Sequence, residues 1–159
     1  MSTRIVATVD PARGRVEART DRGQLIAMDT DPPEGDDSAA GPKEALLAAL
    51  AGCTAMDVAA ILRKKRQRAA AYEIAVSAES AADHPRVFTT ITVEHRVSGD
   101  VEAEALRRSI ELSSTRYCPV NAMLSKSVTI EHWYRLTSGD GVPSEAMVSV
   151  VGPAGHRVL

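Results

Sequence analysis

The sequence predicts an α+β fold in which antiparallel sheets surround one long buried helix. Three observations lead to this prediction. Short strand-like runs of β-branched residues recur before and after the middle of the chain, a segment beginning at Pro42 is almost entirely apolar or small, and an amphipathic run at 100–114 follows two more strand-like runs. With 159 residues, the chain is long enough for one domain with a real hydrophobic core.

The N-terminal part is expected to form three strands followed by a loop. The strands are predicted at 4–9, 15–19 and 24–28. Asp21-Arg22-Gly23 suits the hairpin turn between the second and third strands. The segment 29–41 is acidic, contains two prolines and has no apolar anchor, as is typical of a long functional or mobile loop.

A long helix is predicted to follow this loop. Pro42 suits its first position, and the helix is expected to end between Lys65 and Arg68, which gives about 24 residues and a length of ~36 Å. Residues 45–56 are nearly all apolar or small, so the helix would need cover on most of its sides. One small sheet cannot supply that cover, and we therefore expect an obligate homodimer.

The remaining elements complete the predicted α+β order. Strands are expected at 72–79, 87–97 and 127–136, and helices at 100–114 and 119–124. We expect the domain to span residues 1–137. Residues 138–159 are rich in Gly, Pro and Ser and are expected to form a partly ordered C-terminal extension, with a strand at 147–151.

Composition argues against two classes of partner. The formal net charge is −2, and the chain has one Trp, one Phe and three Tyr, so neither nucleic acid nor an anionic membrane surface is an expected partner. The N-terminus lacks the apolar stretch of a secretory signal. No apolar run is expected to reach the roughly 20 residues that a membrane helix needs. We therefore expect a cytoplasmic protein.

The chain contains two cysteines, Cys53 and Cys118. In a reducing cytoplasm such a pair is expected to be free thiols or redox partners rather than a permanent bridge. Two cysteines are too few for a structural zinc site without histidine ligands. The four histidines show no ligand spacing next to either cysteine. We therefore expect neither a metal nor a cofactor.

The surroundings of the two thiols leave their roles open. Cys53 would lie about three turns inside the long helix, where a buried thiol is inert and serves as a small core residue. Asp57 would lie about 40° from Cys53 around the helix, and its carboxylate would oppose a thiolate. Cys118 precedes Pro119 and would cap the short helix, where backbone N–H groups favour a thiolate, although capping or packing alone also fits.

Two motifs at these residues resemble a known family. Pro-x-Glu-x-Leu-Leu-x-Ala-Leu-x-Gly-Cys-Thr, which begins at Pro42, and Cys-Pro-Val, which begins at Cys118, are similar to those of the OsmC/Ohr family of thiol-dependent hydroperoxide reductases. The likeness covers roughly residues 5–135. Segments 52–58 and 83–88 look most like the less characterised OsmC-like branch. The resemblance implies an intertwined homodimer with two long central helices between sheets.

The resemblance also implies roles for individual residues. Cys53 would be the peroxidatic thiol and Cys118 the resolving thiol. An arginine from the N-terminal strands, best matched by Arg13 with Arg15 as the second candidate, would act with a glutamate at the start of the central helix. The glutamate position, ten residues before the cysteine, holds Lys43. The neighbouring Glu44 is the remaining candidate, although it lies about 180° from Cys53 on a regular helix.

Two functions follow from these residues. In the first, the protein is an antioxidant peroxidase that reduces organic hydroperoxides through a Cys53 sulfenic acid and a Cys53–Cys118 disulfide, with an external dithiol as reductant. In the alternative, Lys43 marks a catalytically weak OsmC-like protein that binds a small apolar ligand at the dimer interface. A thioredoxin-like dithiol oxidoreductase is disfavoured because no Cys-x-x-Cys is present.

Overall fold

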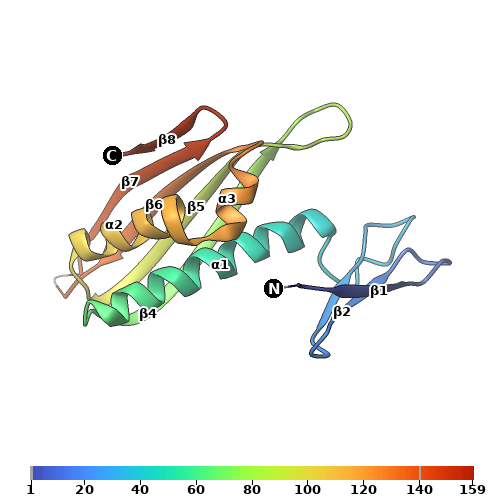
Figure 1. Cartoon of the computed structure of the whole chain (residues 1–159), viewed down its shortest axis with the longest axis horizontal. Coiled ribbons are helices and arrows are strands. Elements are labelled where there is room, and N and C mark those ends of the chain that lie inside the picture. Colours follow the sequence, from blue (N-terminus) through green and yellow to red (C-terminus); the bar gives the residue numbers. More distant parts are fainter. Residues whose placement is uncertain (1, 140) are drawn as a thin grey trace. The chain divides into compact units, whose positions relative to one another are not determined.

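Two sheets organise the chain, one of three strands in the order β1-β2-β3 and one of five in the order β4-β5-β6-β7-β8. They belong to two units, the first ending at Leu47 and the second beginning at Ala48. The computed structural model describes residues 2–139 and 141–159 (Figure 1). The element order confirms the predicted α+β class.

The N-terminal unit has a small antiparallel sheet with little interior. It comprises β1 (Ile5–Val9), β2 (Val16–Thr20) and β3 (Leu25–Met28). Every residue of β1 is exposed, including three large apolar side chains, whereas Ala18 of β2 is buried. Within this unit, the apolar surface of β1 is therefore left without cover.

The loop after β3 is held by hydrogen bonds rather than by apolar contacts. The buried Asp29 accepts hydrogen bonds from the backbone N–H of Thr30, at 2.8 Å, and from both the backbone N–H and the hydroxyl of Ser38, at 3.0 and 2.6 Å. These donors, the Ser38 hydroxyl first, lower the pKa of Asp29 to about 2. The segment predicted to lack an apolar anchor thus has a polar one.

The C-terminal unit contains the five-stranded sheet. Its strands are β4 (Arg68–Ser80), β5 (Phe88–Asp100), β6 (Thr129–Thr137), β7 (Pro143–Gly152) and β8 (Gly155–Val158). Pairing is antiparallel except between β5 and β6, which run parallel. The exception to the predicted antiparallel pairing arises because helices connect β5 to β6, and parallel neighbours need such a crossover.

Residues 143–158 continue this sheet as β7 and β8, so the expected C-terminal extension is largely strand. The strand predicted at 147–151 lies within β7, and Val148 of β7 is fully buried in the core. The segment expected as an extension therefore contributes directly to the packing of the C-terminal unit.

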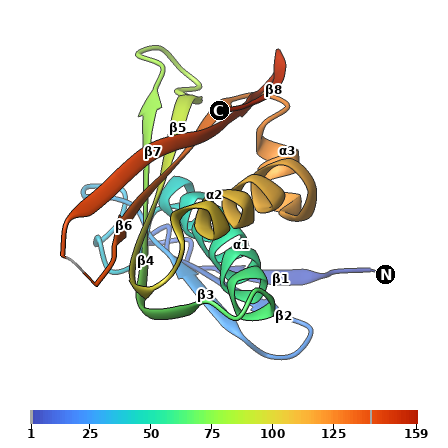
Figure 2. The ribbon, with the colours of Figure 1, turned by 90° about the vertical axis from the view of Figure 1, so that its left-hand side faces the viewer.

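The helices are α1 (Pro42–Lys64), α2 (Ala103–Leu112), the π-helical turn η1 (Ser113–Tyr117) and α3 (Pro119–Leu124). The helix predicted at 100–114 is thus an α-helix that continues into a wider π-turn. Figures 1 and 2 both show α1, α2 and α3 on one face of the five-stranded sheet.

The core of the C-terminal unit lies between these helices and the sheet. Its buried residues come from α1, β5, α2, β6 and β7, and one lies between β5 and α2. They are Val58, Leu62, Val97, Val101, Leu106, Ile110, Leu136 and Val148. Tyr72 and Tyr134 pack against this cluster.

Within one chain, α1 buries a single stripe instead of its whole circumference. The stripe consists of residues spaced four apart, namely Leu50, Thr54, Val58 and Leu62. Met56 is 74% exposed. By length and composition α1 is also apolar enough to cross a membrane, contrary to the sequence prediction, although core helices of globular proteins meet the same criterion. The packing of the C-terminal unit therefore covers one side of α1 and leaves apolar residues on its other sides exposed.

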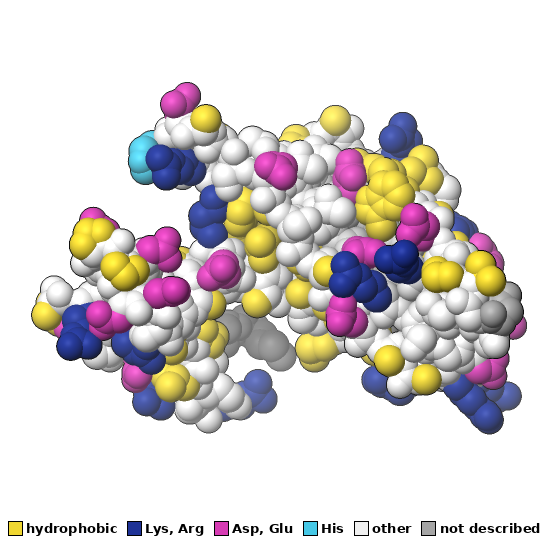
Figure 3. All heavy atoms as spheres, turned by 180° about the vertical axis from the view of Figure 1, so that it is seen from behind, with side chains coloured by type: hydrophobic (Ala, Val, Ile, Leu, Met, Phe, Trp, Pro, Cys, Tyr) yellow, Lys and Arg dark blue, Asp and Glu magenta, His cyan; other side chains and the backbone are white. Residues whose placement is uncertain are grey.

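Charged side chains of both signs are interspersed on the face of the molecule seen in Figure 3. On the C-terminal sheet, Arg96 of β5 forms ion pairs with Glu73 at 2.7 Å and with Glu94 at 2.6 Å. Such exposed pairs are screened by solvent and contribute little to stability.

Candidate thiol active site

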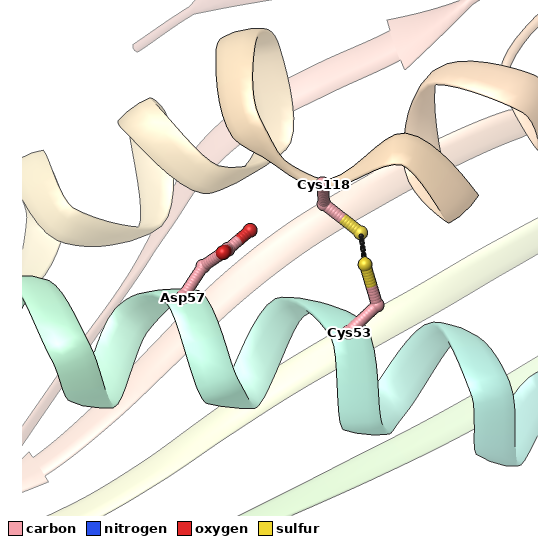
Figure 4. A group of neighbouring side chains, drawn as sticks. All are labelled: Cys53, Asp57 and Cys118. Carbon is pink, nitrogen blue, oxygen red and sulfur yellow. Dashed lines mark hydrogen bonds between the residues drawn. The ribbon is translucent and has the colours of Figure 1, made fainter. Parts of the chain in front are cut away.

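The two cysteines meet where α1 passes the start of α3. Cys53 points outward from α1 and Cys118 stands at the N-cap of α3, and their sulfur atoms are 2.6 Å apart (Figure 4). Both are free thiols, with Cys118 buried and Cys53 half-buried. Sixty-five residues apart in sequence, they lie close enough for a disulfide to form with a small adjustment.

The turn before α3 places Cys118. The backbone N–H of Cys118 donates to the carbonyl of Ser113, which closes the π-turn, and Pro119 occupies the first position of α3. The Cys118 sulfur accepts a hydrogen bond from the backbone N–H of Asn121 at 3.3 Å. This confirms the predicted N-cap.

Burial outweighs the cap in setting the charge of Cys118. Desolvation first, and then the hydrogen bond with Cys53, raise the pKa of the Cys118 thiol to about 12, while the Asn121 N–H lowers it. Cys118 is therefore protonated at neutral pH and donates its S–H to Cys53. Of the two roles that the sequence leaves open for Cys118, this desolvation favours the capping and packing role in the resting state over a thiolate.

A polar cluster adjoins the sulfur pair. Asp57 lies one turn after Cys53, and its carboxylate points toward the segment that carries Cys118 (Figure 4). Ser113 donates its hydroxyl to Asp57 at 3.1 Å and also lies 3.0 Å from the hydroxyl of Thr54. One carboxylate oxygen of Asp57 and the two sulfurs all lie within 4.8 Å of one another. A proton acceptor is thus available beside both thiols.

A second polar chain leads from Cys118 into the core. Asn121 donates its side-chain NH₂ to the carbonyl of Ser114 at 2.7 Å, so its Oδ1 is the acceptor for Nε2–H of His132 at 2.9 Å. The His132 ring stacks on His95, with centroids 5.9 Å apart. Nδ1 of His95 is in turn 2.6 Å from the hydroxyl of Tyr72. Buried polar side chains therefore extend from Cys118 into the sheet interior, with a ring stack instead of a hydrogen bond between the two histidines.

Both histidines of this chain are fully buried and neutral at ordinary pH. Burial lowers the pKa of His132 to about 4, and burial together with the neighbouring His132 lowers that of His95 well below its usual value. Among the described residues, Nε2 of His95 and Nδ1 of His132 are the buried side-chain nitrogens without a hydrogen-bond partner. Protonating either ring would place an uncompensated charge in the core.

The other predicted site residues belong to the N-terminal unit. Arg13 is exposed and forms an ion pair with Asp36 at 2.8 Å, and Arg15 hydrogen-bonds the hydroxyl of Ser38. Glu44 accepts a hydrogen bond from the backbone N–H of Gly41 at 2.8 Å, the reciprocal half of a capping box at the start of α1. The structure thus brings the two thiols together, and a role for Arg13 and Glu44 beside them stays a prediction.

Sequence reasoning missed the residues that surround the sulfur pair. Asn121 carried one usable clue, because it stands three residues after an expected N-cap, where its N–H meets the capping side chain. Ser113 and His132 carried none, since a serine in an amphipathic helix and a histidine in a strand are ordinary. Ser113 reaches the site through the π-turn, and His132 reaches it through the parallel pairing of β5 with β6.

Comparison with known proteins agrees with this architecture. Residues 35–132 match the family described as OsmC-like protein. The chain is 38% identical over 117 residues to protein YhfA of Escherichia coli, covering 73% of this chain and 85% of that protein. A crystal structure of a hypothetical protein from Aquifex aeolicus superposes with a TM-score of 0.77 at 24% identity, over 87% of this chain and 98% of the other.

The organic hydroperoxide resistance protein OhrB of Bacillus subtilis shares the fold at greater distance, with a TM-score of 0.59 and 15% identity over 83% of this chain and 96% of the other. At that identity the likeness concerns the fold alone. The match to the family over most of the chain, together with the identity to YhfA, shows that the protein belongs to the OsmC-like family.

Proposed function

We propose that the protein reduces small organic hydroperoxides with Cys53 as the attacking thiol and Cys118 as the resolving thiol. The observation that carries this proposal is the 2.6 Å separation of the two sulfurs. The half-buried Cys53 is the thiol that a substrate can reach, whereas Cys118 is buried and its raised pKa keeps it protonated until the second step.

The proposed cycle has three balanced steps. The Cys53 thiolate attacks the O–O bond of the hydroperoxide, takes up one oxygen as a sulfenic acid, and releases the alkoxide, which a proton converts to the alcohol. Cys118 then attacks the Cys53 sulfur; the disulfide forms and the sulfenic oxygen leaves as water. An external dithiol reduces the disulfide by thiol exchange and is itself oxidised.

Asp57 supports the second step. Because the pKa of Cys118 is raised to about 12, its thiol must lose a proton as it attacks. The Asp57 carboxylate lies within 4.8 Å of both sulfurs and is oriented by Ser113. It is therefore placed to take that proton, directly or through one water molecule.

The N-terminal unit and a second subunit complete the proposal. Arg13, or Arg15 in its place, would stabilise the Cys53 thiolate, and Glu44 would orient that arginine. A homodimer would cover the apolar faces of α1 and β1 that one chain leaves exposed. The shared fold with a protein named for organic hydroperoxide resistance supports this substrate class, and a reducing compartment such as the cytoplasm suits the cycle.

Stopped-flow reduction of tert-butyl hydroperoxide by the pre-reduced full chain tests the proposal. We expect two thiols to be lost per peroxide and an intramolecular disulfide in the intact mass. Cys53→Ser should abolish turnover. Cys118→Ser should consume one equivalent and leave a sulfenic acid that dimedone traps. If Cys53→Ser consumes peroxide as fast as the unaltered protein, the proposal is wrong.

The same experiment separates the alternative function. A catalytically weak protein that binds an apolar ligand at a dimer interface should show little turnover and retain both thiols after one equivalent of peroxide. Lys43 in the family's glutamate position is the observation that favours it. Lys43→Glu should then raise peroxide turnover if that substitution is what limits the thiol chemistry.

A further inference from the structure

The cluster of Cys53, Asp57 and Cys118 has a second chemical capacity. We propose that, in the reduced protein, these three side chains bind one thiophilic divalent cation of the zinc class. The binding uses the thiols but does not rest on the peroxidase activity proposed above.

The donor atoms are already gathered. One carboxylate oxygen and two sulfurs lie within 4.8 Å of one another. A tetrahedral ion with bonds of about 2.3 Å to sulfur and about 2.0 Å to oxygen requires donor atoms roughly 3.5–4 Å apart. The sulfurs, now at 2.6 Å, would need to separate by about 1 Å, which a small rotation of the half-buried Cys53 side chain can supply.

The fold fixes the three donors independently of any ion. Cys53 and Asp57 are four residues apart on α1, so successive turns of one helix present them on the same side. Cys118 comes from the N-cap of α3, whose backbone is held by the π-turn. Two donors from one rigid helix and a third from a facing turn are a common construction for a metal site.

Neighbouring groups orient the donors. Ser113 donates a hydrogen bond to Asp57, and Asn121 donates its backbone N–H to the Cys118 sulfur. Hydrogen bonds of this kind fix ligand geometry and affect metal affinity by about 10–100-fold. The third ligand is a carboxylate one turn after the first cysteine, where the sequence expectation of no metal rested on the absence of histidines near the thiols.

Charge and protons balance on binding. The ion displaces one proton from each thiol, both of which pass to solvent, so two thiolates, one carboxylate and a divalent cation leave the site with a net charge of −1. Three protein ligands leave a fourth position for water. Because protons compete with the ion, binding should tighten as pH rises.

The bound ion and the disulfide exclude each other, because both use the same sulfur electron pairs. If the thiols also react with peroxide as proposed, one hydroperoxide and two protons would convert the metal-bound thiolates to a disulfide, an alcohol and water, and the divalent ion would be released. The cation would thus protect the reduced thiols, and oxidation would free it.

Titration of the anaerobic, fully reduced chain with Co²⁺ tests the site. We expect one equivalent to produce sulfur-to-cobalt charge-transfer absorption and tetrahedral d–d bands, with release of two protons, and Zn²⁺ to displace the spectrum. Cys53→Ser and Cys118→Ser should each weaken the charge-transfer band, and Asp57→Asn should weaken affinity at least about tenfold. The exposed carboxylate variant Asp83→Asn is the matched control and should bind as the unaltered protein does.

Folding of each variant is checked by the fluorescence of Trp133, the only tryptophan. Ser113→Ala keeps all three ligands and should reduce affinity less than Asp57→Asn does. The proposal is overturned if no charge-transfer band appears, or if folded Asp57→Asn binds Co²⁺ unchanged. Because the titration contains no peroxide, a negative result would overturn the metal site without bearing on the proposed peroxidase activity.

Discussion

The two units of the chain are stabilised in different ways. The C-terminal unit encloses a core between its sheet and its helices, and holds both thiols. The N-terminal unit has one buried alanine in its sheet, an exposed first strand and a loop fixed by a single buried carboxylate. The comparison indicates that the thiol pair is positioned by the packing of the C-terminal unit, whereas Arg13 and Glu44 lie in a unit with little apolar core of its own.

Truncating the core should give the largest difference between the units. Leu106→Ala, in the fully buried cluster, should lower the free energy of unfolding by about 2–5 kcal/mol because it leaves a cavity. Ile5→Ala, on exposed β1, should change it by less than about 0.5 kcal/mol at high dilution. Urea unfolding followed by far-ultraviolet circular dichroism, which reports the strands of both units, measures both.

Repeating the β1 measurement at high protein concentration sharpens the comparison. If a second subunit covers β1, the cost of Ile5→Ala should grow with concentration, because association stabilises the folded state by mass action. A large cost at every dilution would show that β1 is already buried within one chain.

Acid should destabilise the two units in different pH ranges. The folded pKa of His132 is about 4, below its unfolded value of 6.5, so the native state binds fewer protons and stability falls as pH drops from 6.5 toward 4. The loss from His132 alone is about 3 kcal/mol, and His95 shifts in the same direction. Asp29, with a folded pKa of about 2, keeps its contribution above pH 3.8 and loses it as pH falls through 2.

Hydrogen exchange at pH 7, 5 and 3 measures this order. Amides of β5 and β6 should lose protection first, while the amide of Ser38 should keep its protection relative to unstructured segments until the lowest pH. His132→Gln retains an amide that can meet Asn121 and should flatten the dependence between pH 6.5 and 4. Loss of Ser38 protection before that of β6 would contradict the assignment.

The exposed ion pair of the N-terminal unit should give a small effect. Asp36→Asn removes the partner of Arg13 and should cost at most about 1 kcal/mol, because both side chains are more than half exposed and screened by water. Salt titration of the unaltered protein should reproduce most of that change. A larger cost would place the pair in a buried environment, as a subunit interface would provide.

Much of the fold could be predicted from local patterns. The bounds of α3 were predicted to the residue because Pro119 marks its start, and β1–β3 were found within a residue because turn residues separate them. The π-turn was not predictable, since it is defined by a shift in backbone hydrogen bonding that leaves the apolar spacing of α2 intact. The parallel pairing of β5 and β6 was likewise not predictable, because it depends on tertiary packing and has no local sequence pattern.

At the site, the sequence identified the cysteines but not their surroundings. Spacing gave Cys118 its N-cap position, yet its raised pKa depends on burial that only packing produces. The angle between Cys53 and Asp57 followed from helix geometry, but Ser113, which donates a hydrogen bond to Asp57, lies 56 residues further along the chain. Local sequence patterns cannot identify such site residues, because they are distant in sequence and common in type. The crossover between β5 and β6 brings them together only in the folded chain.

Because of the crossover between β5 and β6, the reactivity of the two thiols can be used to follow one step of folding. Cys53 precedes the whole C-terminal sheet, and Cys118 lies in the connection from β5 to β6, which docks onto α1 at the sulfur pair. Alkylation or oxidation pulses during refolding would therefore time that docking chemically, in contrast to the β4–β5 hairpin, which forms between sequence neighbours.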